Sequence, residues 1–351
     1  MMKNLFILGT AESGKTAVAV GLALKLKELG YQVAYFKPVA NLTGATSGQD
    51  RDALLMKQVL EMRPDTGDIA PYKAGPSYLS TYRHNETIEQ LIATYEKVAA
   101  GADIVVIGGA SDPSIMSTLG LDAVTLARRL GAATLFIIKI KNDYSLDQTV
   151  FLNNHFSGRD IPVIGNIFNN VPRPLLAKTE GIYRQRLLER GYRTLGIIPA
   201  KHDFAYPTVA EYYDTLGGEL LAGEDKLDRP VEDLIIGAMT IESALGYLRR
   251  SPNKAFITGG DRAELALAAL ETSTSVIILT GGLYPDVKVI AKAAEKGVPV
   301  ILVHYDTYAT MEKLAEVAKN IRPGDKQAID AAKETIEKHV NWEYIVDQLK
   351  K

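Results

Sequence analysis

Short apolar runs alternate with segments of helical periodicity along most of the chain. In residues 1–215 we expect buried strands at 5–8, 32–36, 104–107, 133–138, 163–168 and 194–199. Between them we expect helices at 17–30, from 50–52 onward, and at 88–100, 121–130 and 180–190. This alternation predicts an α/β fold with a mostly parallel sheet and helices on both of its faces.

A second series of strands and helices follows a polar, turn-rich segment at 216–230. Its expected strands are 234–238, 255–258, 276–279 and 298–303, and its expected helices are 241–250, 262–271, 286–296 and 308–319. We therefore predict a first domain at 1–215, a linker at 216–230, a smaller α/β domain at 231–322 and a helical tail at 323–351. The apolar stripe of the tail is typical of a helix that docks on the second domain or, alternatively, of an oligomer contact.

Residues 9–16 connect the first predicted strand to the first predicted helix and match the phosphate-loop pattern G-x-x-x-x-G-K-[ST]. The motif consists of Gly9, Thr10, Ala11, Glu12, Ser13, Gly14, Lys15 and Thr16. Glycines let backbone N–H groups turn toward phosphate oxygens, and the helix N-terminus adds its dipole. Lys15 is expected to neutralise the β- and γ-phosphates, and the Thr16 hydroxyl to bind Mg²⁺. The alternative, a simple turn with a surface lysine, is disfavoured by the strand–loop–helix context.

Composition excludes several classes of function. The 46% hydrophobic and 23% charged residues are ordinary for a globular protein, and a net charge of -2 gives no reason to expect nucleic-acid or membrane binding. The absence of cysteine excludes disulfides, iron–sulfur clusters and thiolate zinc sites. No apolar run approaches the roughly 20 residues of a membrane span, and the short N-terminal run is no signal peptide. We therefore expect a cytoplasmic protein.

Several motifs together resemble dethiobiotin synthetase over about residues 3–205. They are the phosphate loop, Tyr35-Phe36-Lys37-Pro38-Val39, Asp52-Ala53-Leu54, Ala70-Pro71-Tyr72, Phe168-Asn169-Asn170-Val171 and Leu195-Gly196-Ile197-Ile198-Pro199. In that family ATP phosphorylates a carboxylate or carbamate, and an amine then attacks the mixed anhydride. The resemblance implies catalytic roles for Lys15 and Lys37, a second Mg²⁺ contact from Asp52, and an adenine contact from Asn169.

The residues themselves leave other roles open for these positions. Lys37 ends a predicted strand, where ligands bind in open α/β sheets, but it could also be a solvated lysine. Asp52 could be only a helix cap, and Asn169 could only stabilise its turn. One position breaks the family pattern, because Gly108 stands where a metal-contacting glutamate is expected. Asp112, four residues further on, is a weak substitute.

The second half resembles the DRTGG domain through residues 256–264, 279–282 and 304–308. A P-loop domain followed by a DRTGG domain is similar to the non-catalytic N-terminal part of long phosphotransacetylases. The acetyl-transferring domain would have to follow residue 351, so we expect it to be absent. Glycine turns at Gly259-Gly260, before Asp261-Arg262, and at Gly281-Gly282 could form anion-binding nests, or Asp261 could simply cap the next helix.

Two functions follow from these features. The first is a nucleotide-dependent regulatory or sensory protein that binds ATP and Mg²⁺ and relays the nucleotide state to its second domain or to a partner. The second is an ATP-dependent carboxylate–amine ligase acting on a small carboxylated substrate. A P-loop domain of this kind resembles proteins that build their sites across a dimer, so we expect a homodimer.

Overall fold

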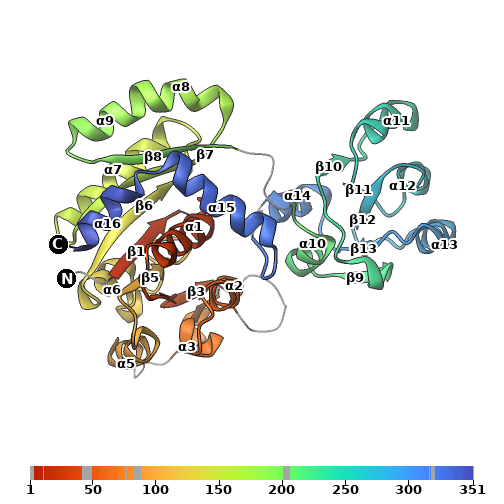
Figure 1. Ribbon diagram of the computed structural model, residues 1–351. Helices are drawn as coiled ribbons and strands as arrows, with labels where there is room; N and C mark the ends of the chain where they lie inside the picture. Colours follow the sequence, from red (N-terminus) through yellow and green to blue (C-terminus); the bar gives the residue numbers. More distant parts are fainter. Residues whose placement is uncertain are drawn as a thin grey trace. The chain divides into compact units, whose positions relative to one another are not determined.

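The structure, a computed structural model, describes residues 4–10, 12–41, 50–75, 77–82, 88–200, 206–315, 317 and 321–350. These residues form two compact units (Figure 1). The first contains the described residues up to Ala200 together with those from Ile321 onward, and the second contains those from Tyr206 to Val317. The second unit is thus an insertion between the sheet of the first unit and its C-terminal helices.

The first unit is built on a parallel sheet that has six strands in the described part of the chain, in the order β2-β5-β1-β6-β7-β8. The strands are β1 (Asn4–Gly9), β2 (Val33–Phe36), β5 (Ile104–Gly108), β6 (Ala132–Ile138), β7 (Val163–Val171) and β8 (Thr194–Pro199). A separate parallel pair joins β3 (Val39–Asn41) to β4 (Tyr72–Ala74). The expected sheet is therefore confirmed, with β1 at its centre.

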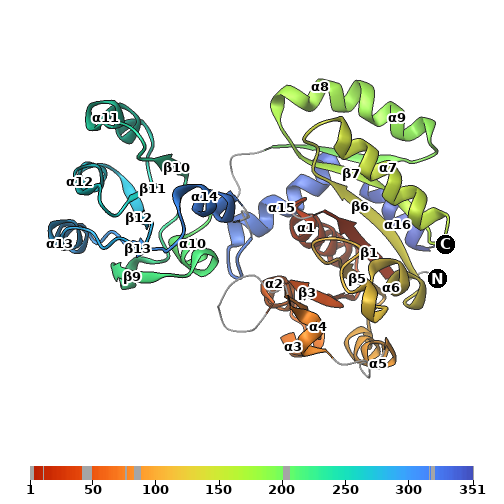
Figure 2. The same cartoon turned by 180° about the vertical axis from the view of Figure 1, so that it is seen from behind.

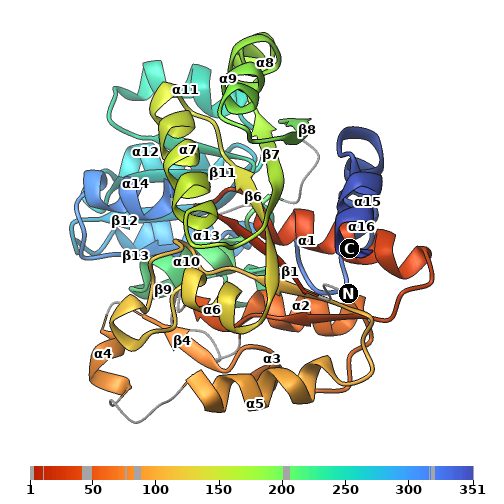
Figure 3. The same ribbon diagram turned by 90° about the vertical axis from the view of Figure 1, so that its left-hand side faces the viewer.

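Alternate residues of β1 point to opposite faces of the sheet, and each face carries its own core. Leu5 and Ile7 pack with helices α1 (Lys15–Glu28), α2 (Arg51–Val59), α15 (Lys326–His339) and α16 (Trp342–Lys350). Phe6 and Leu8 pack with helices α5 (Ile88–Ala99), α6 (Ala123–Arg129) and α7 (Asp143–Ser157). Figure 3 shows these helices on both sides of the strands. Such period-two burial is what a sheet covered on both faces requires.

The remaining elements of the first unit are short. They are α3 (Thr66–Ile69), α4 (Tyr78–Thr81), the 3₁₀ turns Ser117–Leu119 and Arg173–Leu175, and the continuous segment α8 (Leu176–Lys178), π-turn Thr179–Tyr183 and α9 (Arg184–Glu189). Tyr183 and Leu187 of this segment pack against β7. The sequence did not predict helix α7, whose exposed Tyr144 and Phe151 obscure its apolar face.

The second unit contains a sheet of five described strands in the order β10-β11-β12-β13-β9, with only β9 antiparallel. The strands are β9 (Glu219–Ala222), β10 (Asp233–Ile236), β11 (Lys254–Gly259), β12 (Thr274–Thr280) and β13 (Val300–Leu302). Its helices are α10 (Val209–Leu216), α11 (Ile241–Arg250), α12 (Ala263–Leu270), α13 (Val287–Lys296) and α14 (Thr307–Ala315), with a 3₁₀ turn at Glu224–Lys226. Helices α10 and α14 contribute to one core, and α11, α12 and α13 to cores on the opposite face (Figure 2).

Two boundaries differ from the sequence prediction. The segment 216–230 is not a linker, because β9 lies within it and pairs with β13. The C-terminal tail does not dock on the second unit. Helix α15 lies along α1, close enough that a Cβ on Gly21 would be 2.5 Å from the carbonyl oxygen of Ala332 (Figure 1). The apolar stripe of the tail thus completes the core of the first unit.

Candidate functional site

The phosphate loop leaves the carboxyl end of β1 and enters α1. Gly14, the residue before α1, has φ 79°, and a Cβ there would lie 2.2 Å from Nδ2 of Asn169. Both the backbone conformation and the close approach therefore require glycine. The carbonyl of Gly14 accepts a hydrogen bond from the backbone N–H of Val18 at 3.2 Å, so α1 starts directly after the loop. Ala11 lies outside the described residues.

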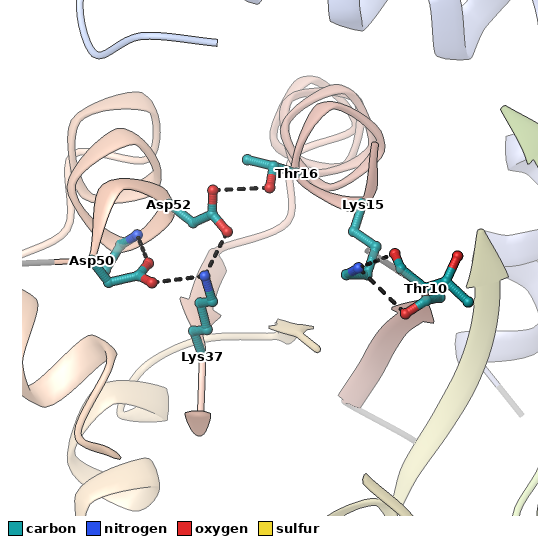
Figure 4. Close-up of polar contacts among 8 residues, drawn as sticks. Thr10, Lys15, Thr16, Lys37, Asp50 and Asp52 are labelled. Atoms are coloured by element: carbon teal, nitrogen blue, oxygen red, sulfur yellow. Dashed lines mark hydrogen bonds and ion pairs between the residues drawn. The ribbon is translucent and has the colours of Figure 1, made fainter. Parts of the chain in front are cut away.

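Lys15 is folded back along the loop. Its Nζ donates to the carbonyl oxygens of Thr10 at 2.7 Å and of Gly9 at 3.3 Å (Figure 4). Burial, partly opposed by the negative charge of Asp52, lowers the pKa of Lys15 to about 8. The ammonium group is therefore held by neutral carbonyls in a place where its positive charge is poorly solvated. A bound phosphate would stabilise this charge.

A chain of polar contacts joins α1 to β2 and α2. The Thr16 hydroxyl donates to Oδ1 of Asp52 at 2.9 Å, and the other carboxylate oxygen of Asp52 lies 2.7 Å from Nζ of Lys37 (Figure 4). Nζ of Lys37 also lies 2.7 Å from Oδ2 of Asp50, whose Oδ1 accepts from the backbone N–H of Ala53. Asp50 is therefore both the cap of α2 and a partner of Lys37. This role was not predicted from the sequence, although the pattern Asp50-Arg51-Asp52 at a helix start contained the signal.

The two carboxylates of this cluster differ in their environments. Lys37 and Asp50 are almost completely buried, whereas a quarter of the Asp52 side chain is exposed. Burial raises the pKa of Asp50. Burial acts in the same direction on Asp52, but the charge and hydrogen bond of Lys37 outweigh it and lower its pKa. The pKa of Lys37 is raised, because Asp52 and Asp50 together overcome its burial. Lys37 is thus a charged lysine and not a solvated one.

The end of β5 carries no acidic side chain. Gly108 is its last residue, and a Cβ there would lie only 2.0 Å from the hydroxyl oxygen of Tyr35 on the neighbouring strand. Asp112 is exposed, and its Oδ1 accepts hydrogen bonds from the backbone N–H and hydroxyl of Ser114. Its negative charge reaches Lys15, but its hydrogen bonds stabilise its own turn.

Asn169 near the end of β7 holds the phosphate loop. Its Nδ2 donates to the carbonyl oxygen of Ser13 at 2.9 Å, so the adenine contact stays a prediction beside this observed contact. The Ser13 hydroxyl is buried and has no hydrogen-bond partner in the described part of the chain. Glu12 pairs with Lys139 at the end of β6, at 2.5 Å. A buried hydroxyl without a partner, beside Lys15, is what a loop built for an anion presents before the anion binds.

The described residues contain no group of three or more acidic or histidine side chains that could enclose a metal ion. Thr16 and Asp52 are nevertheless adjacent oxygen donors. Such a pair fits Mg²⁺, which usually takes one or two protein ligands and completes its shell with phosphate oxygens and water.

The glycine turn at Gly281-Gly282 in the second unit does not present free backbone donors. The N–H groups of Gly281 and Gly282 donate to the carbonyl oxygens of Tyr305 and Val303. Asp261 and Arg262 are both exposed, and no side chain caps α12. The N–H groups expected to form a nest at Gly281-Gly282 are therefore already used within the sheet edge.

No helix in the described ranges combines the length and apolarity that a bilayer crossing requires.

Comparison with known proteins gives the family. A model described as an AAA domain matches residues 3–208, more than half of the chain, and one described as a DRTGG domain matches residues 211–317. The phosphate acetyltransferase of Pseudomonas aeruginosa is 25% identical over 367 residues, covering 98% of this chain and 52% of that protein. That of Synechocystis sp. is 22% identical over 367 residues, covering 100% and 52%. The chain spans about half the length of the curated relatives it matches.

Two solved structures show more distant similarity. The CBS and DRTGG domains of the regulatory region of Clostridium perfringens pyrophosphatase, complexed with the activator diadenosine tetraphosphate, match with 22% identity and a TM-score of 0.29, covering 38% of this chain and 60% of that one. The MinD cell division protein of Aquifex aeolicus matches with 14% identity and a TM-score of 0.37, covering 57% and 83%. The order of domains expected from the sequence is confirmed by the two family matches. The chain belongs to the AAA domain family of P-loop proteins, with a DRTGG domain after the P-loop domain.

Proposed function

We propose that this protein binds ATP with Mg²⁺ at the phosphate loop of its first unit and acts as a nucleotide-dependent regulatory or sensory protein. The observation that carries the proposal is the arrangement of Lys15, Thr16 and Asp52 around one loop. Lys15 would leave the carbonyls of Gly9 and Thr10 for the phosphates, and Thr16 and Asp52 would hold the cation. When bound, Mg²⁺ neutralises phosphate charge and orients the oxygens around it.

The residues around the proposed cation site support a regulatory function. Gly108 places no carboxylate at the end of β5, and Lys37 is bound by two carboxylates. A group that polarises a reacting phosphate must be available to it in the transition state. Lys37 would first have to give up one or both of its carboxylate partners, which favours binding over rapid chemistry.

A ligase that activates a carboxylate with ATP is the second candidate. Its support is the position of Lys37, which is charged and bonded to the same Asp52 that contacts Thr16. If a bound nucleotide and cation drew Asp52 away, the Lys37 ammonium would lie next to the phosphates. A carboxylated substrate would then be the partner of that ammonium.

Titration calorimetry with ATP and Mg²⁺ tests nucleotide binding. We expect Lys15→Ala to weaken binding by about 30- to 100-fold, the worth of a hydrogen bond to a charged group. Lys27→Ala is a matched control, because Lys27 lies on the same helix and, in the described part of the chain, forms an ion pair with the exposed Glu61. Equal affinities in the two variants would contradict the phosphate-loop assignment.

Phosphate release separates the two candidate functions. The regulatory proposal expects slow ATP hydrolysis that carboxylates and amines do not accelerate. Stimulation of turnover by a carboxylate together with an amine would favour the ligase.

We also propose that the protein is a homodimer. Tyr144 and Phe151 lie seven residues apart on α7 and are 80% and 66% exposed, so both are apolar groups on one face of that helix. Sedimentation equilibrium should give twice the mass of the chain, and Phe151→Glu should lower it to that of the monomer. A monomeric parent protein would contradict this part of the proposal.

A further inference from the structure

Tyr35 fills the space at the end of β5 in which a side chain of residue 108 would lie. It is the third residue of β2, it is 1% exposed, and its ring packs in the same core as α1. A Cβ on Gly108 would be 2.0 Å from the Tyr35 hydroxyl oxygen and 2.8 Å from the ring carbon that bears it. Gly108 and Tyr35 are therefore a matched pair, in which the tyrosine brings a hydroxyl where the neighbouring strand provides no side chain.

The Tyr35 hydroxyl has no hydrogen-bond partner among the described residues. By contrast, the buried Tyr183 donates to Asp143 at 2.5 Å, and the half-buried Tyr95 donates to Asn4 at 2.6 Å. The Tyr35 oxygen is not among the enclosed side-chain atoms that lack a partner in the described residues. It is therefore open to solvent, and a water molecule or a bound ligand can reach it.

The surroundings of the hydroxyl indicate which partner that is. Burial, together with the charges of Asp52 and Asp50, raises the pKa of Tyr35 well above its ordinary value, so the phenol stays protonated and neutral. Tyr35 also packs in one core with α1 and α2, the helices that carry Thr16 and Asp52. By this packing the hydroxyl lies on the acidic side of the site, where Asp52 contacts Thr16. This is the side on which a cation belongs, whereas Lys15 marks the side of the phosphates.

We propose that Tyr35 is a binding residue of the nucleotide–cation site, and that its hydroxyl hydrogen-bonds to a water molecule of the cation held by Thr16 and Asp52. The inference rests on the proposed binding of ATP and Mg²⁺. Mg²⁺ usually keeps several of its waters, and each of these needs acceptors and neighbours in a buried site. A neutral phenol provides such a contact without adding a negative charge to Asp50 and Asp52, which Lys37 and Lys15 already balance.

The test is Tyr35→Phe, which removes only the hydroxyl, with ATP affinity measured by calorimetry in Mg²⁺ and again in EDTA. We expect the dissociation constant in Mg²⁺ to rise about 5- to 20-fold, the range for one lost hydrogen bond, and the value in EDTA to stay unchanged. The melting temperature of the ligand-free variant should be equal or higher, because a partnerless hydroxyl is gone. Tyr95→Phe is the matched control, since it should lower the melting temperature and leave both affinities unchanged.

Other outcomes would overturn the inference. An unchanged affinity in Mg²⁺ would show that the hydroxyl contacts nothing in the bound state. An equal loss in Mg²⁺ and EDTA would assign it to the nucleotide or to the fold instead of the cation. Failure of the proposed function looks different, because the parent protein itself would then bind no ATP under either condition.

Discussion

Replacing Gly108 with alanine tests the packing at the end of β5 directly. The backbone of Gly108 has no positive φ, so alanine is not disfavoured by conformation there, and the effect is steric. The new Cβ would lie 2.0, 2.8 and 3.2 Å from three atoms of the Tyr35 phenol. Ordinary contact begins near 3.4 Å, so the hydroxyl would have to move by about 1.4 Å, the difference between 3.4 and 2.0 Å.

The magnitude follows from how little room Tyr35 has. Its ring is fully buried between β2 and α1, and overpacking of such a site costs about 1–3 kcal/mol. A glycine-to-alanine change also stabilises the folded state by about 0.4–1 kcal/mol, because it lowers the conformational entropy of the unfolded chain. We therefore expect Gly108→Ala to reduce the free energy of unfolding of the first unit by about 1–2 kcal/mol.

The single tryptophan of the chain makes the assay specific. Trp342 on α16 packs against the core of the first unit, so its fluorescence in urea reports that unit alone. Gly67→Ala on α3 is the matched control, because a Cβ there meets nothing within 4 Å and should not destabilise the protein. The reasoning would be refuted if Gly108→Ala were as stable as the parent, or if its cost were the same in a Tyr35→Ala background.

Three further predictions concern the same unit. Lys37→Met should cost about 3–5 kcal/mol in urea unfolding at pH 7, because it leaves the two carboxylates without their ammonium partner. In the variant, burial raises the pKa of both carboxylates without the opposing charge of Lys37, so the loss should shrink as the pH falls and they take up protons. Lys15 has a pKa of about 8, and bound phosphates should raise it, so ATP binding near pH 8.5 should be accompanied by uptake of a proton and should weaken as the pH rises. Calorimetry in buffers of different ionisation enthalpy measures this proton uptake, which should vanish at pH 6.5. Gly21→Ala places a Cβ 2.5 Å from the Ala332 carbonyl and should destabilise the first unit by about 1–2 kcal/mol in the Trp342 assay, despite better helix propensity.

The sequence predicted the parts of the site that are formed by contiguous residues. The phosphate loop was identifiable because the strand, the glycines and the helix follow one another within residues 4–28, and the structure has them in that order. The parallel sheet was identifiable for a similar reason, since each buried strand is a short apolar run with a helix after it. The position of Lys37 at the carboxyl end of a strand, where ligands bind in open α/β sheets, also followed from the sequence pattern.

The remaining features depend on contacts between distant residues, which no local pattern encodes. Asp50 looks like an ordinary helix cap until β2 brings Lys37 beside it. The apolar stripe of α15 is compatible with any apolar surface, and the glycines that α15 approaches closely, Gly21 on α1 and Gly196 on β8, lie far from it in the sequence. Strand β9 is short and half-buried at a sheet edge, so its composition resembles that of a linker.

Gly108 shows why the missing carboxylate has to be considered together with Tyr35. Gly108→Glu alone would drive its Cβ into the phenol, so it should unfold or distort the first unit and leave the function of the acid unanswered. Combined with Tyr35→Gly, the same glutamate would have space on the acidic side of the site and would replace a neutral hydroxyl by a charge. If the lack of an acid limits chemistry, the double variant should hydrolyse ATP faster than Tyr35→Gly alone, measured as phosphate release per folded protein. A well-folded Gly108→Glu variant with raised turnover would mean that Tyr35 does not occupy this space.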